Sequence, residues 1–309
     1  MPQSASAIRI RLLVRALNRL TPNARGIASM LGAMAAFAIG DAIMKLLAGR
    51  MPLGETLFVR GLMASAIIWF FAARTGALPD VSKMWNRFLS WRTAADVAAS
   101  FFYIAALGRV PLADAGAIMQ TNPLAVTAGA ALFLGEKVGW RRWTATAVGF
   151  LGVLMIIQPG SATFSWASLL VIGAVVVSAA RDLVTRHLTG IPTVLVTAAA
   201  ATATTVASLG LLPFEIWKRP AMSEVVLLAL AGCFMLAGQL LVIVSIRSGD
   251  VSAVVPFRYS AILWTLLLSM LIWGYLPNAL TLTGIVVVSG AGLYAFFREQ
   301  ALRREGKMP

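Results

Sequence analysis

Apolar runs of about twenty residues recur along the whole chain. An α-helix rises about 1.5 Å per residue, so a run of this length crosses the roughly 30 Å hydrocarbon core of a bilayer. The chain is 59% hydrophobic and 12% charged, whereas soluble domains are about 25% charged. A water-soluble fold of 309 residues does not hide that much apolar surface. The sequence therefore predicts an all-α membrane protein.

The apolar runs define ten predicted transmembrane helices. They lie near residues 27–48, 55–73, 93–109, 112–134, 140–158, 166–186, 191–212, 224–246, 250–273 and 279–297. Short connections that contain Pro or Gly separate most of them. Pro123 and Pro256 fall inside the fourth and ninth spans, where we expect them to interrupt the helix, either as hinges or as simple kinks.

The net charge of +14 reflects where basic residues lie relative to the spans. Most Lys and Arg residues fall at one set of span ends, and the opposite side receives only Arg50, Arg109, Lys218 and Arg219. The positive-inside rule explains this bias without nucleic acid, and it predicts that both termini are cytoplasmic. We expect the protein to lie in the bacterial inner membrane. Residues 1–26 lack the unbroken apolar core of a signal peptide. We interpret them as a basic cytoplasmic segment on the membrane surface, with an organellar transit peptide as the alternative, and residues 298–309 as a basic cytoplasmic tail.

A spaced motif occurs twice. Asp41-x-x-x-Lys45-x-Leu47-x-Gly49 in the first span recurs as Asp182-x-x-x-Arg186-x-Leu188-x-Gly190 in the sixth. A weaker echo sets Arg109, Gln120 and Leu134 against Arg247, Arg258 and Ile272. Each unit holds five spans, an odd number, so the second copy enters the membrane from the opposite side. The sequence thus predicts two inverted-topology repeats, 27–158 and 166–297, with a substrate site near the midplane between them.

The fourth and fifth spans carry a group of motifs. They are Arg109-Val-Pro-Leu-Ala-Asp114-Ala-Gly, Gln120-Thr-Asn122-Pro123, Leu134-Gly-Glu136, Trp140, Gly149-Phe-Leu-Gly152-Val and Gln158-Pro159-Gly160. In these motifs the chain resembles the EamA-type transporters of the drug/metabolite transporter superfamily. The second copy departs from the family pattern, because Gly274 replaces the acidic residue that follows span nine. The Asp41, Lys45 and Arg60 pattern is similar to superfamily members that take up riboflavin or S-adenosylmethionine.

Asp41, Lys45 and Arg60 are predicted to lie at similar depth below the outer surface. Asp41 and Lys45 are four residues apart and share one helix face. We expect Asp41 to pair with Arg60 or with Lys45, because an ionised side chain inside the membrane faces a partner or a cavity. Such a group either fixes the helix register or leaves positive charge for an anionic substrate, with Asp41 as the residue for charge pairing or proton coupling.

Arg258 and Gln120 occupy equivalent positions in the two repeats, each near the middle of its span. A guanidinium at that depth needs a partner, and it forms bidentate pairs with carboxylates or phosphates. Further candidate substrate-binding residues are Tyr103, Tyr259 and Trp264, which can stack on a planar ligand, and Gln239 and Asn122, which can bridge helices instead.

The resemblance and the polar residues together predict a secondary transporter of a small organic metabolite that works by alternating access. Uptake of a planar or anionic vitamin-like or cofactor-like solute, such as riboflavin or S-adenosylmethionine, is the first expectation, with a proton or ion as the coupled species. Export of amino acids or toxic metabolites is the alternative. An intramembrane enzyme or a channel is the alternative of another class. With His187 and Cys233 as the single residues of their types, we expect no metal site, no cofactor and no catalytic residues.

Overall fold

The computed structural model describes residues 21–136, 139–161, 164–188 and 190–304, so most of the predicted N-terminal segment and part of the tail lie outside the described residues. The described residues form helices and no strands. The α-helices are α2 (Pro22–Ala48), α3 (Leu53–Arg74), α4 (Arg87–Leu107), α5 (Leu112–Met119), α6 (Asn122–Phe133), α7 (Trp140–Ile157), α8 (Ala167–Thr185), α9 (Thr193–Ser208), α10 (Met222–Ser248), α11 (Val251–Val254), α12 (Ser260–Trp273) and α13 (Ala279–Arg304). Short 3-10 helices are η1 (Leu78–Met84), η2 (Leu209–Phe214) and η3 (Val255–Tyr259).

Seven helical segments of the described chain are long and apolar enough to cross a membrane, so the protein has several transmembrane spans. They are Pro22–Ala48, Leu53–Arg74, Ala167–Thr185, Thr193–Phe214, Met222–Ser248, Val255–Trp273 and Ala279–Leu302. Spans three to five of the sequence prediction fall on α4, α5–α6 and α7, outside this group. Helix α4 carries Arg92 and Asp96, α5 and α6 are two short helices, and α7 has Arg141 and Arg142 in its first turn. The count of ten spans therefore stays a prediction.

The two interruptions predicted at proline are confirmed. Helix α5 ends at Met119 and α6 begins at Asn122, with Pro123 in its first turn. In the ninth predicted span, Pro256 lies in η3, between α11 and α12. Proline has no backbone N–H and its ring clashes with the carbonyl four residues earlier, so a continuous α-helix ends before it. The fourth and ninth predicted spans are thus each interrupted next to their proline.

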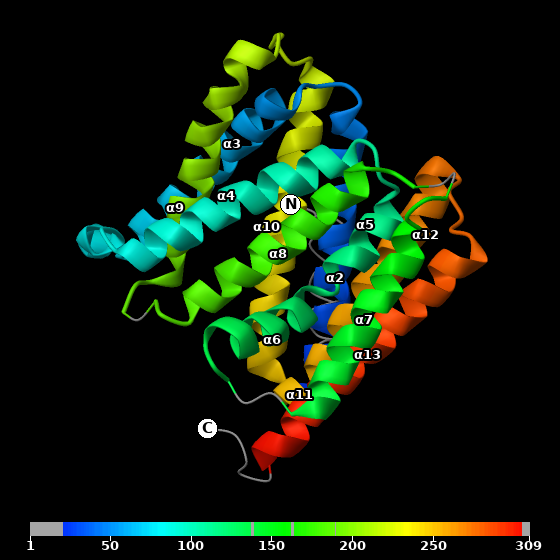
Figure 1. Ribbon diagram of the computed structural model, residues 1–309. Coiled ribbons are helices and arrows are strands. Elements are labelled where there is room, and N and C mark those ends of the chain that lie inside the picture. The colour runs from blue at the N-terminus through cyan, green and yellow to red at the C-terminus, as the bar shows by residue number, and fades with distance from the viewer. Residues whose placement is uncertain (1–20, 137–138, 162–163, 189, 305–309) are drawn as a thin grey trace, which may run out of the picture.

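The helices pack in pairs (Figure 1). Helix α2 packs along α10, α4 along α8, α3 along α9 and α7 along α13. Helices α5 and α12 also contact one another, as do α12 and α2, and α6 and α8. In the α7–α13 pair the backbones meet, because a Cβ added to Gly284 would lie 2.6 Å from the carbonyl oxygen of Gly152.

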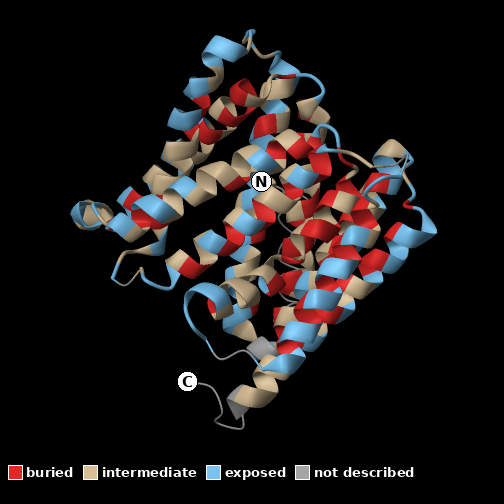
Figure 2. Cartoon of the chain, in the orientation of Figure 1, coloured by how far each residue is buried: buried red, intermediate tan, exposed pale blue. Residues whose placement is uncertain are grey.

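Buried residues form clusters of different size at the predicted outer and inner ends of the spans, and Figure 2 shows how burial varies along the helices. One large cluster joins α2, α3, α4, α5, α7, α8, α10, α12 and α13, mostly through residues of the predicted outer halves of the spans, such as Leu47, Leu107, Leu112 and Ile157. Toward the predicted inner side there are three separate clusters instead. They are built around Met30 and Met34 on α2 with Val254, around Leu124 with Ala145, Ala291 and Ala295, and around Ala72 with Ala77 and Leu195.

Candidate functional site

A carboxylate on α2 joins three helices. The hydroxyl of Tyr103 on α4 donates a hydrogen bond of 2.8 Å to Oδ2 of Asp41. Arg60 on α3 lies close enough for its charge to attract Asp41, and its Nη2 donates to the sulfur of Met235 on α10 at 3.0 Å. We call Asp41, Arg60 and Tyr103 the α2–α3–α4 polar group. All three residues were candidates from the sequence, and the structure brings them together.

Lys45 does not pair with Asp41, so that alternative of the sequence analysis is wrong. The Lys45 ammonium donates to the carbonyl oxygens of Leu107 and Val110, at 2.7 and 2.6 Å, and lies 5.5 Å from the centre of the Trp273 ring. The last carbonyls of an α-helix have no partner within the helix. The carbonyl oxygens at and just after the end of α4 are within reach of Lys45. Lys45 lies one turn nearer the end of α2 than Asp41 does, so its ammonium reaches them instead of the carboxylate.

Gln120 and Arg258 are adjacent, at the two helix breaks. Nε2 of Gln120 donates to the backbone carbonyl oxygen of Arg258 at 3.0 Å. The Arg258 side chain is exposed, and it forms no ion pair with any carboxylate of the described residues. We call these two residues the α5–η3 polar group. Met119 and Tyr259, the chain neighbours of these two residues, pack against the large core cluster, and so does Tyr103 of the other group.

The other four candidates lie apart. Tyr259 packs on Gly292 of α13, and its hydroxyl is buried without a hydrogen-bond partner among the described residues. Trp264 packs against the Met30 cluster. Asn122 donates to Asp182 of α8 at 2.9 Å, and Gln239 is exposed on α10.

A charged network on the predicted inner side was missed by the sequence analysis. Arg181 forms ion pairs with Asp96 on α4 at 2.9 Å and with Asp182 at 2.8 Å, and Arg92 also pairs with Asp96 at 2.6 Å. Asp96 and Arg181 fall inside predicted spans, so the rule that intramembrane charges need partners would have identified both. Their position joins α4 to α8.

A second carboxylate was also missed. Asp114, in the first turn of α5, accepts a hydrogen bond of 2.9 Å from the hydroxyl of Tyr275, which follows α12. Burial, followed by the nearby Asp114 charge, raises the pKa of the Tyr275 phenol well above its ordinary value, so this hydroxyl stays protonated and acts as donor. Asp114 is the one carboxylate within the fourth predicted span, so the rule that intramembrane charges need partners would have identified it too.

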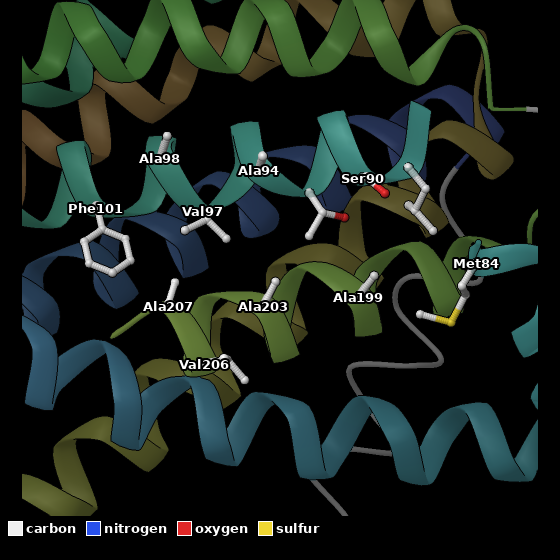
Figure 3. Close-up of a pocket in the computed structure, with 12 residues that line it drawn as sticks. Met84, Ser90, Ala94, Val97, Ala98, Phe101, Ala199, Ala203, Val206 and Ala207 are labelled. Atoms are coloured by element: carbon white, nitrogen blue, oxygen red, sulfur yellow. The ribbon is translucent and has the colours of Figure 1, made fainter. Parts of the chain in front are cut away.

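One groove on the described residues is mostly apolar. It has a volume of about 740 Å³ and lies between α4 and α9, lined by Ala94, Ala98, Ala203 and Val206 among others (Figure 3). A smaller one of about 410 Å³ is lined by residues of α7, α8 and the loop between them. Neither is lined by a member of the two polar groups, so both suit hydrocarbon better than a polar solute. The described residues contain no group of three His, Cys, Asp or Glu that could hold a metal ion.

Comparison with known proteins adds four similarities. Residues 24–158 match the EamA-like transporter family. The chain is 32% identical over 206 residues to a riboflavin transporter of Rhizobium johnstonii, an alignment that covers 66% of this chain and 68% of the relative. It is 25% identical over 198 residues to an S-adenosylmethionine uptake transporter of Rickettsia bellii, covering 63% and 67%. It is 27% identical over 259 residues to the pseudopaline exporter CntI of Pseudomonas aeruginosa, covering 82% and 89%.

A protein of known crystal structure has the same fold. It superposes with a TM-score of 0.62 at 17% identity, over 89% of this chain and 98% of the other. At this identity the likeness concerns the fold alone.

Proposed function

Because the chain belongs to the EamA-like transporter family, we propose that it is a secondary carrier which moves a small organic metabolite across the bacterial inner membrane by alternating access. The observation on which this proposal depends most is the presence of two polar groups beside the same core cluster. They combine two guanidinium groups, one carboxylate and one amide at membrane depth. Rare polar residues at this depth mark substrate pathways in membrane proteins.

Reciprocal packing supports two inverted five-helix repeats, 27–158 and 166–297. In such repeats span one corresponds to span six and span three to span eight, so α2 corresponds to α8 and α4 to α10. The packing of α2 along α10 then corresponds to that of α8 along α4. Helix α3 packs on its own counterpart α9, and α7 on its counterpart α13. A two-fold axis in the membrane plane requires that corresponding helices of the two repeats make corresponding contacts in this way.

Contacts between span ends also agree with the repeats. Lys45, near the end of span one, lies against Trp273 at the end of span nine. The equivalent residue Arg186, after span six, forms an ion pair with Glu136, after span four, at 2.5 Å. Each contact links the first helix of one repeat to the fourth helix of the other.

The distribution of buried clusters favours an inward-facing conformation. With both termini cytoplasmic, the large cluster closes the outer ends of the spans, and the inner ends divide among three smaller clusters. Both polar groups border the large cluster on its inner surface. A solute there would be reached from the cytoplasm.

The charge balance of the two polar groups favours a neutral or anionic planar solute. Arg60 and Arg258 carry two positive charges against the single negative charge of Asp41, and Tyr103 offers an aromatic ring. A flavin is planar, uncharged and rich in hydrogen-bond acceptors, whereas S-adenosylmethionine carries a sulfonium cation that two guanidinium groups repel. We therefore propose a flavin-like solute ahead of S-adenosylmethionine. Tyr259, which follows Arg258 in η3, and Gln239 are further proposed solute contacts, while Asn122 and Trp264 join helices.

Export is the second candidate. The similarity to the pseudopaline exporter extends over 82% of this chain, further than that to the riboflavin transporter, at 66%.

Counterflow in proteoliposomes tests the proposal. Vesicles loaded with unlabelled solute are placed in a trace of labelled riboflavin, S-adenosylmethionine or an amino acid, because only a carrier accumulates label by exchange. We expect riboflavin to exchange fastest. Arg258→Ala should lower exchange by about tenfold or more, since a lost hydrogen bond to a charged group is equivalent to about 1.5–3 kcal/mol.

Arg109→Ala is the matched control, because Arg109 is exposed and lies outside both polar groups. Equal exchange by the Arg258 and Arg109 variants would show that the site is elsewhere. Leakage without exchange for every solute would indicate a channel instead of a carrier.

A further inference from the structure

The predicted outer ends of four spans meet in one set of polar contacts. Lys45 of α2 donates to the carbonyl oxygens of Leu107 and Val110, where α4 leads into α5. The same ammonium lies over the ring of Trp273, at the end of α12. Two residues later, Tyr275 donates to Asp114 of α5. Leu107 and Val110 belong to the large core cluster and Trp273 packs against it. We call Lys45, Asp114 and Tyr275 the outer gate.

Asp114 is only half satisfied in this arrangement. Its Oδ2 accepts the hydrogen bond from Tyr275, but its Oδ1 is buried and has no hydrogen-bond partner among the described residues. Lys45 attracts Asp114 but does not form an ion pair with it, because two of its hydrogens are directed at backbone carbonyls. A buried carboxylate without a full set of partners is costly when ionised, and it lowers that cost by taking up a proton.

We propose that Asp114 is a proton-binding site which controls the outer gate, closed when the carboxyl group is protonated and open when it is ionised. This inference rests on the proposed function, because a gate has meaning only in a carrier that opens outward. It differs from the role of Asp41, which lies at the proposed solute site.

The proposal requires one proton and two positions of Lys45. When protonated Asp114 is neutral, Lys45 keeps its bonds to the end of α4 and the gate stays closed. Loss of the proton to the outer medium leaves a carboxylate that attracts the ammonium. Lys45 then leaves the carbonyls of Leu107 and Val110, and α2 separates from the end of α4. Lys45 and Tyr275 are the titratable groups of the described residues that act on Asp114.

Cysteine labelling from outside the cell tests the gate without any substrate. Val110 is 1% exposed, so a thiol there reacts with an impermeant maleimide only when the gate opens. The substitution Val110→Cys is made in a protein that also carries Cys233→Ser. Its labelling is divided by the labelling of Arg219→Cys, an exposed position on the predicted outer side. The ratio corrects for the effect of pH on thiol ionisation. We expect the ratio to rise with external pH, by up to about tenfold per pH unit for one proton.

Asp114→Asn imitates the protonated side chain, so it should keep labelling low at every pH. Asp114→Glu retains a carboxyl group and should restore the pH dependence, which also shows that the position tolerates substitution. A labelling ratio that is high and independent of pH would overturn the proton-binding role of Asp114, and so would an unchanged pH response in Asp114→Asn. Neither result would affect the proposed carrier function. Low labelling of Val110→Cys at all pH values with strong labelling of Arg219→Cys would contradict outward opening and therefore the proposed function.

Discussion

At the scale of single residues, the polar side chains of this protein differ in whether a partner is within reach. Asp41 has the hydroxyl of Tyr103, and Lys45 has two backbone carbonyls. Arg258 has an exposed side chain and no ion pair with a described carboxylate. An arginine at the centre of a helix costs about 2.5–3.5 kcal/mol when it faces lipid, so Arg258 is expected to face water or solute. The surroundings of Arg258 would therefore change more than those of Asp41 or Lys45 when a solute binds.

Tyr103→Phe should destabilise the protein by removing the hydrogen bond to Asp41. Hydrogen bonds to charged groups contribute about 1.5–3 kcal/mol, and the carboxylate would be left without its donor. We therefore expect a lower unfolding temperature in detergent and slower transport. Tyr294→Phe is the matched control, because Tyr294 is 50% exposed on α13. Equal unfolding temperatures for both variants would mean that the hydroxyl of Tyr103 contributes nothing to stability.

The sequence identified the charged residues better than their partners. Helical spacing placed Asp41 and Lys45 on one face, but a shared face does not decide where a long, flexible side chain ends. The free carbonyls at the end of α4, which Lys45 binds, depend on where α4 ends in space. Asp114 was missed for a different reason, since its importance depends on Tyr275, 161 residues away.

At the scale of elements, the helix pairs depend on small residues where two backbones meet. In α13, Gly284 lies against the carbonyl of Gly152, whereas nothing lies within 4 Å of the position that a Cβ would take at Gly290. The helix therefore provides a contact position and a free position within two turns of one another.

Gly284→Ala should weaken the α7–α13 pair, because the new methyl group would lie 2.6 Å from a backbone oxygen that has little freedom to move. Overpacking of this kind costs about 1–3 kcal/mol. Gly290→Ala should instead be neutral or slightly stabilising, because alanine favours helix more than glycine does. Thermal unfolding of the two purified variants measures the difference. If Gly284→Ala were as stable as Gly290→Ala, close backbone contact would not be what holds this pair.

Helix interruptions were predictable from the sequence, and helix lengths were less so. Proline acts locally, so Pro123 and Pro256 indicated the breaks in spans four and nine directly. The start of α4 at Arg87, six residues before the predicted 93, was hidden by its charged first turns. Arg87 and Arg92 lowered the hydropathy ahead of the predicted span, but Arg92 pairs with Asp96, which also pairs with Arg181 of α8.

At the scale of the whole molecule, the buried clusters distinguish the two membrane sides. A single cluster at the predicted outer ends means that many helices must separate before that side opens. Three smaller clusters at the inner ends leave the helices grouped as α2 with α10 and α12, α6 with α7 and α13, and α3 with α9. Bundles that move as units against one another are how inverted-repeat carriers alternate access.

A disulfide across the outer ends should therefore stop transport. A Cβ added to Gly108 would lie 3.4 Å from the Cβ of Ala48, close to the separation found in disulfides, about 3.5–4.5 Å. In a protein with Cys233→Ser, we expect Ala48→Cys and Gly108→Cys together to cross-link α2 to the end of α4 on oxidation. The carrier would then be held inward-facing. Exchange in proteoliposomes should fall to background and return on reduction.

A cross-link inside one group of helices should leave transport intact. A Cβ added to Gly40 would lie 3.9 Å from the Cβ of Phe234, so Gly40→Cys with Phe234→Cys joins α2 to α10, which pack along one another. If α2 and α10 move as a unit, this second bond changes nothing that transport requires. Loss of exchange with both cross-links would mean that α2 moves relative to α10. If neither cross-link stops exchange, α2 does not separate from the end of α4 during transport. That result would contradict an outer side that opens there.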